Sequence, residues 1–201
     1  MNQNINVVGF ELDTKTKIFN VAARLMAQKG YNAVSMREIS EQSGVSKPTI
    51  YYHFNSKEGL YQELINTAID YGDAQLDEIL QRDLTVKQKL VELVKVRFQQ
   101  SLKFPDFAKF FLYLFVSLED TPLVDRFKKE AISRREIMVD LIQEGIDKKE
   151  FGISVKTQIA VEIIIGTLIH FISQQLASKR KILSDQLAEE IIEVLFKGLN
   201  E

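Results

Sequence analysis

Residues 35–60 read SMREISEQSGVSKPTIYYHFNSKEGL, and they contain two short helix patterns separated by a tight turn. Ser35 followed by Glu38 is a capping box, in which the hydroxyl and the carboxylate each bond a free amide at a helix start. Gly44 suits the left-handed conformation that ends this helix, and Ser46 suits the N-cap of the next one. Two short helices joined by a glycine-containing turn predict a helix-turn-helix unit, whose second helix enters the major groove of DNA.

The second helix of this pair, residues 47–54, has an unusual outer face. Ile50 and Phe54 are four residues apart and are expected to pack inward. The other positions place rings and hydroxyls in solvent, where these groups suit contacts with phosphates and base edges. Together with the flanking helix caps, the predicted DNA-binding residues are Ser35, Ser46, Lys47, Pro48, Thr49, Tyr51, Tyr52, His53 and Lys57.

The run SGVSKPTIYYHFNSKEGL, residues 43–60, resembles the signature of the TetR family of transcriptional regulators, and the resemblance extends over residues 14–64. It implies an all-α protein of about nine helices, in which a three-helix head binds DNA and a larger body binds an effector and dimerises. On this basis residues 1–56 are expected to form the helix-turn-helix domain, and residues 57–201 the effector-binding and dimerisation domain. The function implied is that of a repressor released from a palindromic DNA operator by a small, largely apolar ligand.

The resemblance also implies roles within the second helix of the pair. Thr49 and Tyr51 are the implied readers of base edges or thymine methyl groups, and His53 and Lys57 the implied phosphate contacts. Lys47 departs from the family pattern and suits either guanine or phosphate, so the operator sequence stays open.

Charge is unevenly distributed along the chain. The net charge is −2 overall, but residues 14–62 hold seven Lys or Arg against three Asp or Glu. A basic head on an acidic body would orient the head toward DNA.

Several kinds of chemistry are absent from the sequence. It holds no cysteine, which excludes disulfides and thiolate metal sites, and it has no metal-binding or phosphate-loop motif. We therefore expect no cofactor, no metal and no enzymatic activity. An N-terminal segment without a signal-peptide pattern, read as a loose arm over residues 1–12, favours a cytoplasmic protein.

Helical periodicity continues through the rest of the chain. The segment 154–178 is the most apolar, and we expect it to be too short and too polar to span a bilayer. The segment 122–149 carries a run of charges that is expected to form a solvated face. The predicted helices outside the helix-turn-helix pair cover residues 14–29, 56–81, 85–102, 105–116, 122–149, 154–178 and 184–199.

An aromatic stretch over residues 104–115 is the candidate effector site. Its rings either fill a core or line a cavity, and the sequence leaves both readings open. Glu162 and His170 are two helical turns apart and could provide polar contacts to a ligand; a helical enzyme using this pair is a remote alternative. The predicted ligand-binding residues are Phe98, Phe107, Phe111, Phe115, Glu162 and His170.

The last two helices have more apolar surface than one small bundle needs. We expect them to pair with a second copy in an intersubunit four-helix bundle, which makes the protein a homodimer with two DNA-binding heads. The predicted dimer-interface residues are Ile165, Ile169, Ile172, Leu187, Ile191 and Leu195.

Overall fold

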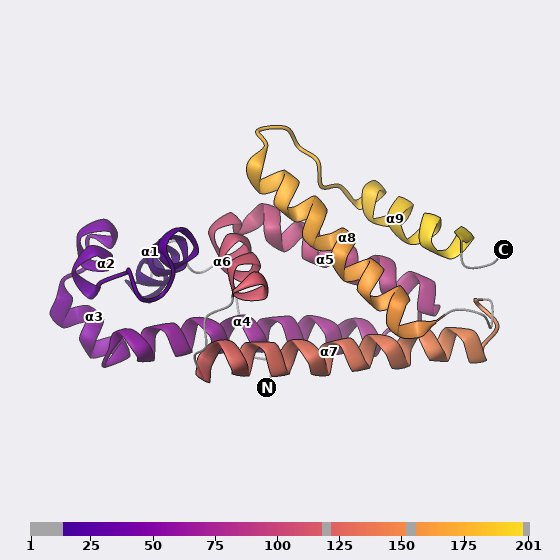
Figure 1. Cartoon of the computed structure of the whole chain (residues 1–201), viewed down its shortest axis with the longest axis horizontal. Helices are drawn as coiled ribbons and strands as arrows, with labels where there is room; N and C mark the ends of the chain where they lie inside the picture. The colour runs from indigo at the N-terminus through magenta and orange to yellow at the C-terminus, as the bar shows by residue number, and fades with distance from the viewer. Residues whose placement is uncertain (1–13, 118–121, 152–155, 199–201) are drawn as a thin grey trace.

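The computed structural model describes residues 14–117, 122–151 and 156–198, so the expected N-terminal arm lies outside the described residues. Over these ranges the chain is helical without any strand, which confirms the all-α prediction (Figure 1). The helices are α1 (Thr14–Lys29), α2 (Met36–Ser43), α3 (Lys47–Phe54), α4 (Lys57–Leu80), α5 (Val86–Lys103), α6 (Pro105–Val116), α7 (Pro122–Asp147), α8 (Thr157–Ala177) and α9 (Asp185–Gly198).

The helix ends follow the local signals in the sequence. The Ser35 hydroxyl accepts the Glu38 N–H at 3.1 Å, and Gly44 takes a φ of 68° directly after α2. The carboxylate half of that predicted capping box is wrong, because the Glu38 carboxylate accepts from Lys29 Nζ at 2.5 Å instead. A complete capping box starts α5, where Thr85 and Gln88 bond each other's backbone amides.

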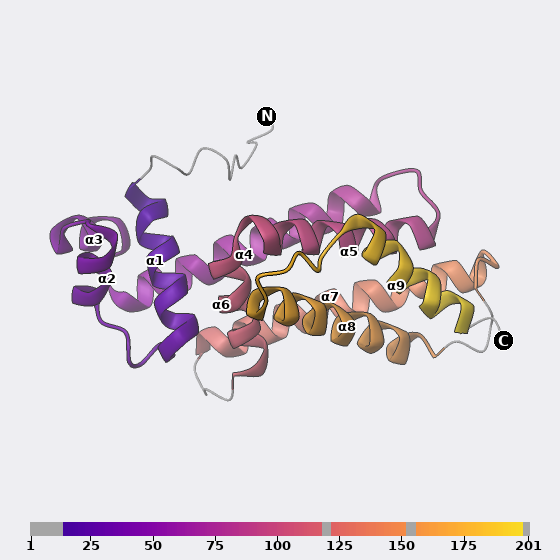
Figure 2. The same ribbon diagram turned by 90° about the horizontal axis from the view of Figure 1, so that it is seen from above.

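The helices form a head, a long body and a connecting helix between them. In Figure 1, α1, α2 and α3 cluster at one end, and α4 runs from them along the body beside α7. The other side of the body holds α5, α8 and α9, and Figure 2 shows α9 lying against α5. Helix α6 packs against α1 of the head and against α5, α7 and α8 of the body.

Two clusters of buried apolar residues form the core. One joins the head to the first half of α4, to α6 and to the start of α7; the other holds α5, α7, α8 and α9 together. Phe110 of α6 belongs to the first cluster and is 0% exposed. The head is therefore packed onto α6 and is not attached through α4 alone.

Helix α8 has two different faces. It is 21 residues long, and by length and composition it could cross a membrane, so the expectation that this segment is too short and too polar is wrong. Only 17% of its apolar window is buried within the protein. Its inner face packs on the body, while Ile159 and Ile163 are exposed to 54% and 46% on the outer face.

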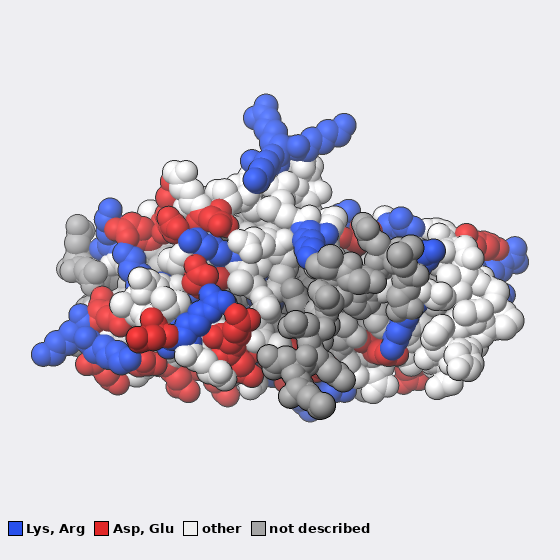
Figure 3. All heavy atoms as spheres, turned by 180° about the vertical axis from the view of Figure 1, so that it is seen from behind, with Lys and Arg blue, Asp and Glu red and all other residues white. Residues whose placement is uncertain are grey.

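Charge on the body surface is mixed. Figure 3 shows acidic and basic side chains interspersed over much of the body when the molecule is seen from behind, with a group of basic side chains alone projecting from its upper edge. The interspersed charges are typical of a solvated surface.

Candidate nucleic-acid interface and ligand cavity

Helix α3 has a buried side and an exposed aromatic side. Ile50 and Phe54 are buried, and the Phe54 ring packs 5.3 Å from the ring of Phe19 in α1. This anchoring turns Tyr51 and Tyr52 outward, where they are 45% and 83% exposed. Two exposed tyrosines in adjacent positions suit contact with a sugar, a phosphate or a base edge.

The start of α3 presents polar groups to solvent. Ser46 caps the helix by accepting the Thr49 N–H at 3.3 Å, and its hydroxyl lies 2.8 Å from the Thr49 hydroxyl. Lys47 and Pro48 are exposed in this first turn. A capped helix start with an adjacent lysine is a suitable site for a phosphate.

Lys57 lies at the junction of α3 and α4 and is held in place by the α1–α2 turn. Its Nζ lies 4.2 Å from the centroid of the Tyr31 ring and donates to the carbonyl of Asn32 at 3.4 Å. Burial, and to a lesser degree the Glu58 carboxylate, raises the pKa of Tyr31 above its usual 10.0. The phenol thus stays neutral, and its ring face positions the ammonium group at the edge of the head.

A cavity of about 790 Å³ lies between the head and the body. Its walls come from α1, α4, α5, α6, α7 and α8, and its size falls within the range of small-molecule sites, about 300–1,000 Å³. Phe107, Phe111 and Phe115, which were predicted to bind ligand, are among the lining residues. An open cavity of this size counts against the alternative of a completely filled core.

Three of the residues expected in the lining lie outside it. Phe98 is 1% exposed and packs in the body core, because it points to the α7–α8 side of α5. Glu162 and His170 are exposed on α8, where Glu162 lies 2.9 Å from Arg135 and His170 contacts Gln174 at 3.3 Å. With both side chains outside the cavity lining, nothing in their arrangement supports an enzyme that uses this pair.

The cavity contains basic residues that the sequence analysis missed. Arg97, Arg134 and Arg135 line it, together with Gln100. The charge run of α7 was expected to be a solvated face, but the side chains of Arg134 and Arg135 are only 19% and 29% exposed. A helical wheel would have placed both arginines near the boundary of the apolar stripe, but only the packing of α4 and α8 shows that they are enclosed.

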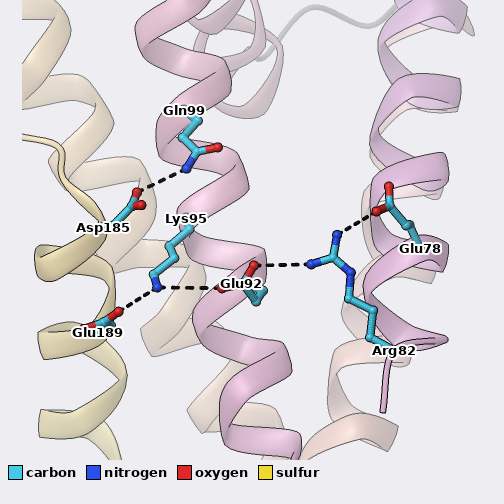
Figure 4. A network of polar contacts seen from close by, with 7 residues as sticks. All are labelled: Glu78, Arg82, Glu92, Lys95, Gln99, Asp185 and Glu189. Atoms are coloured by element: carbon cyan, nitrogen blue, oxygen red, sulfur yellow. Dashed lines mark hydrogen bonds and ion pairs between the residues drawn. The ribbon is translucent and has the colours of Figure 1, made fainter. Parts of the chain in front are cut away.

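A second, shallower cleft of about 500 Å³ lies between the α4–α5 loop, α5 and α9 and is lined mainly by charged residues. Figure 4 shows that these charges contact one another across α4, α5 and α9, and the hydrogen bond to Glu189 is the main cause that raises the pKa of Lys95 above 10.5. The chain of contacts joins Glu78 to Arg82 at 2.6 Å, Arg82 to Glu92 at 3.4 Å, Glu92 to Lys95 at 3.7 Å and Lys95 to Glu189 at 2.6 Å. Because these groups satisfy each other, we assign no ligand to this cleft.

The apolar residues expected at a dimer interface divide into two groups. Ile165, Ile169 and Ile172 of α8 line the cavity in the single chain and are partly buried there. They recur at intervals of three or four residues and so share a helix face, but the sequence does not say what covers that face. Leu187, Ile191 and Leu195 of α9 are half-buried against the body core.

The comparisons with known proteins agree with this geometry. Residues 18–64 match the model of the family described as bacterial regulatory proteins, tetR family. The fatty acid metabolism regulator protein of Bacillus subtilis (strain 168) is 24% identical over 186 residues, which are 92% of this chain and 94% of that protein. The HTH-type transcriptional repressor KstR2 of Mycolicibacterium smegmatis is 26% identical over 144 residues, 68% of this chain and 67% of that one.

A solved structure with the same fold is that of the transcriptional regulator FadR from Bacillus subtilis in complex with stearoyl-CoA. It has a TM-score of 0.73 and 21% identity, with 90% of this chain and 97% of that chain covered. The helix-turn-helix head and the named relatives define a DNA-binding transcriptional regulator, not an enzyme. The match at residues 18–64 and the named relatives make this chain similar to the TetR family of bacterial regulatory proteins.

Proposed function

We propose that this regulator is a homodimeric repressor that leaves a palindromic operator when an amphipathic or apolar ligand enters the cavity. The observation that carries the proposal is the contribution of the head to the cavity wall. Thr16, Lys17, Phe19 and Asn20 of α1 line the cavity together with Thr67 of α4. A ligand in this space contacts the DNA-binding head directly.

The coupling follows from the packing of α1 and α4. Helix α1 rests on α6, and α4 continues from the recognition helix into the body. A ligand that is larger than the empty space must move α1 or α6, and this movement tilts the head. The ligand shifts the equilibrium between the two head positions only by the ratio of its affinities for them. Such coupling typically changes the affinity for the second ligand, here the operator, by about 5–150-fold.

The DNA contacts proposed are those of the exposed face of α3. Thr49 and Tyr51 would read base edges, while Lys47, His53 and Lys57 would contact phosphates, with Ser35, Ser46, Pro48 and Tyr52 at the margins of the interface. In this assignment residues 1–56 are the DNA-binding domain and residues 57–201 the effector-binding and dimerisation domain. Because its target is the chromosome, we place the protein in the cytoplasm.

The dimer would form through the exposed face of α8 and the neighbouring part of α9. Ile159, Ile163 and Gly166 follow one another on the outer face of α8, and Val194 is 71% exposed on α9. A two-fold axis between the bodies would set two copies of α3 one or more DNA turns apart, which is the arrangement that a palindromic operator requires.

The ligand class is proposed from the shape of the cavity and from a relative. The lining is rich in phenylalanine and isoleucine, and the similar fold of FadR from Bacillus subtilis was solved with stearoyl-CoA. A long acyl chain or another extended apolar body would fill a cavity of this kind.

The test begins with selection of bound sequences from a random duplex library by the purified protein. We expect an enriched inverted repeat, and we expect Tyr51→Ala to change its preferred bases while Lys47→Ala weakens binding to all sequences. Lys47→Ala should also reduce the slope of log affinity against log salt by about 1.8, because the dimer loses two phosphate contacts at about 0.9 each. Lys197→Ala, which changes an exposed lysine at the far end of the body, is the matched control.

Ligand response is then measured by fluorescence anisotropy with the selected duplex and dodecanoyl-CoA. Saturating ligand should weaken operator binding about tenfold or more. A library that yields no enriched sequence would contradict the role as a DNA-binding regulator. An unchanged operator affinity with the ligand demonstrably bound would contradict release by an effector.

A further inference from the structure

The described part of the cavity wall carries positive charge only. Its lining includes five basic side chains and, among the described residues, neither Asp nor Glu; the basic residues are Lys17, Arg97, Lys103, Arg134 and Arg135. Enclosing cationic groups beside phenylalanine and isoleucine is unfavourable unless each group meets an acceptor. Each of the three arginines in the lining therefore needs hydrogen-bond acceptors.

Two of the arginines contact carboxylates of residues that do not line the cavity. Arg134 contacts the Asp73 carboxylate through Nε and Nη2, both at 2.6 Å, and Nη2 also donates to the carbonyl of Ile69 at 2.9 Å. Arg135 Nε lies 2.9 Å from the Glu162 carboxylate, although its N–H is not aimed at that oxygen. These two contacts tie α7 to α4 and to α8, so both arginines have a structural role.

Arg97 is arranged differently. Its Nη1 donates to the side-chain oxygen of Gln100 at 3.1 Å, one turn further along α5. This hydrogen bond sets the orientation of the Gln100 amide, because its oxygen must face the guanidinium group. The amide nitrogen, Nε2, is then buried without any acceptor among the described residues, in a side chain that lines the cavity. A buried N–H donor without an acceptor is uncommon in native proteins and is satisfied when a ligand supplies one.

The absence of a side chain at Gly72 brings the two guanidinium groups toward the same place. A Cβ atom at Gly72 would lie 3.4 Å from Arg97 Nη2 and 3.7 Å from Arg134 Cζ. Both guanidinium groups thus approach one point on the surface of α4, next to the Asp73 carboxylate that contacts Arg134. Gly72 also belongs to the lining, so this point is next to the open space of the cavity.

We propose that Arg97 and Gln100 bind the anionic end group of an amphipathic ligand at Gly72, while the phenylalanines of α6 hold its apolar body. The inference rests on the proposed function and adds to it the chemical class of the effector. The end group must be an acceptor without donors of its own, such as a carboxylate or a phosphate. The planar guanidinium group of arginine can bind a carboxylate or a phosphate through two N–H donors at once, which the ammonium group of lysine does less well.

The experiment compares two probes that differ only in the end group, sodium dodecanoate and dodecanol, by isothermal titration calorimetry on the full-length protein. We expect wild type to bind dodecanoate about tenfold or more tightly than dodecanol, since a hydrogen bond to a charged group is worth at least that ratio. Arg97→Met keeps the aliphatic stem and should remove the preference, with dodecanol affinity changed less than about twofold. Arg126→Met, on an exposed part of α7 outside the cavity, should bind both probes as wild type does.

Two further variants keep the test informative if Arg97→Met unfolds, which circular dichroism would show. Arg97→Lys should retain part of the preference for dodecanoate, and Gln100→Met should reduce it while leaving the charge of the site intact. Dodecanoyl-CoA forms a third arm: if its binding alone depends on Arg97, the anion recognised is a phosphate of the coenzyme, and the proposal holds in that form.

The outcomes separate this inference from the proposed function. Equal affinity of wild type for dodecanoate and dodecanol, unchanged in Arg97→Met, would overturn the anion site and leave regulation by an apolar ligand in place. A wild-type protein that binds none of the three probes would overturn both.

Discussion

Two glycines flank the recognition helix and meet different steric demands. Gly44 precedes α3 with a φ of 68°, a left-handed conformation that residues with a Cβ atom adopt at a cost. Gly59 lies in the first turn of α4, where a Cβ atom would be 2.2 Å from the carbonyl oxygen of Phe54. The close approach lets α4 begin directly after α3, so the orientation of the recognition helix relative to α4 depends on the absence of one methyl group.

Replacing Gly59 by alanine should therefore separate α3 from α4. The clash is with the backbone and not with a movable side chain, so we expect Gly59→Ala to lower the free energy of unfolding by about 2 kcal/mol or more. Operator binding should weaken more than this loss explains, because α3 is re-aimed. Urea denaturation followed by circular dichroism, with the exposed Gln62→Ala as control, measures the first effect. A variant as stable as wild type would show that this junction adjusts freely.

Helix α6 connects the head to the ligand cavity. One of its faces is buried in the core shared with the head, where the Phe110 ring lies 5.8 Å from the ring of Tyr61 on α4. Its other face presents Phe107, Phe111 and Phe115 to the cavity, and Phe111 and Phe115 both contact Phe127 of α7. The two faces give this helix two separable duties, stability of the core and contact with the ligand.

A pair of substitutions should separate these duties. Phe110→Ala should lower the free energy of unfolding by about 3 kcal/mol, the cost of truncating a fully buried phenylalanine. Phe107→Ala, at a partly exposed position of the lining, should cost less than about half of that and act on ligand affinity instead. Both values come from urea titrations at one protein concentration, since the stability of a dimer depends on concentration. Similar losses of stability in the two variants would contradict this division of α6.

The outer face of α8 determines how two copies of the chain would meet. The expected interface residues of α8 line the cavity in a single copy, and the exposed face of this helix carries Ile159, Ile163 and Gly166. A Cβ atom at Gly166 would have no neighbour within 4 Å in a single copy, so the close approach of a second helix there would explain a glycine in the middle of a helix.

If the protein is the proposed dimer, Ile163→Glu should convert it into a monomer, because the substitution places a charge in the centre of the proposed interface. Sedimentation velocity should show the change in mass, together with the loss of tight operator binding that two heads provide. Ile132→Glu is the matched control, since Ile132 is 53% exposed on a different helix, α7. A dimeric Ile163→Glu protein would place the interface elsewhere.

Much of this architecture could be predicted because its signals are local. The helix starts at Ser35, Ser46 and Thr85 and the turn at Gly44 depend on residues within a few positions of one another, and each is where it was expected. The buried side of α3 was equally predictable, because Ile50 and Phe54 are large, apolar and four residues apart, and both are buried. Local hydrogen bonding and periodicity thus determined the helices and the DNA-binding head.

The ligand cavity depended on information that no single segment carries. An isoleucine stripe on α8 is compatible with a cavity wall or with a dimer interface, and an arginine on α7 with solvent or with an enclosed space. Phe98 and Phe111 are both phenylalanines of predicted helices, yet one fills the body core and the other faces the cavity. The side chains of neighbouring helices settle these alternatives, because burial is a property of surfaces brought together by packing and not of the pattern along one helix.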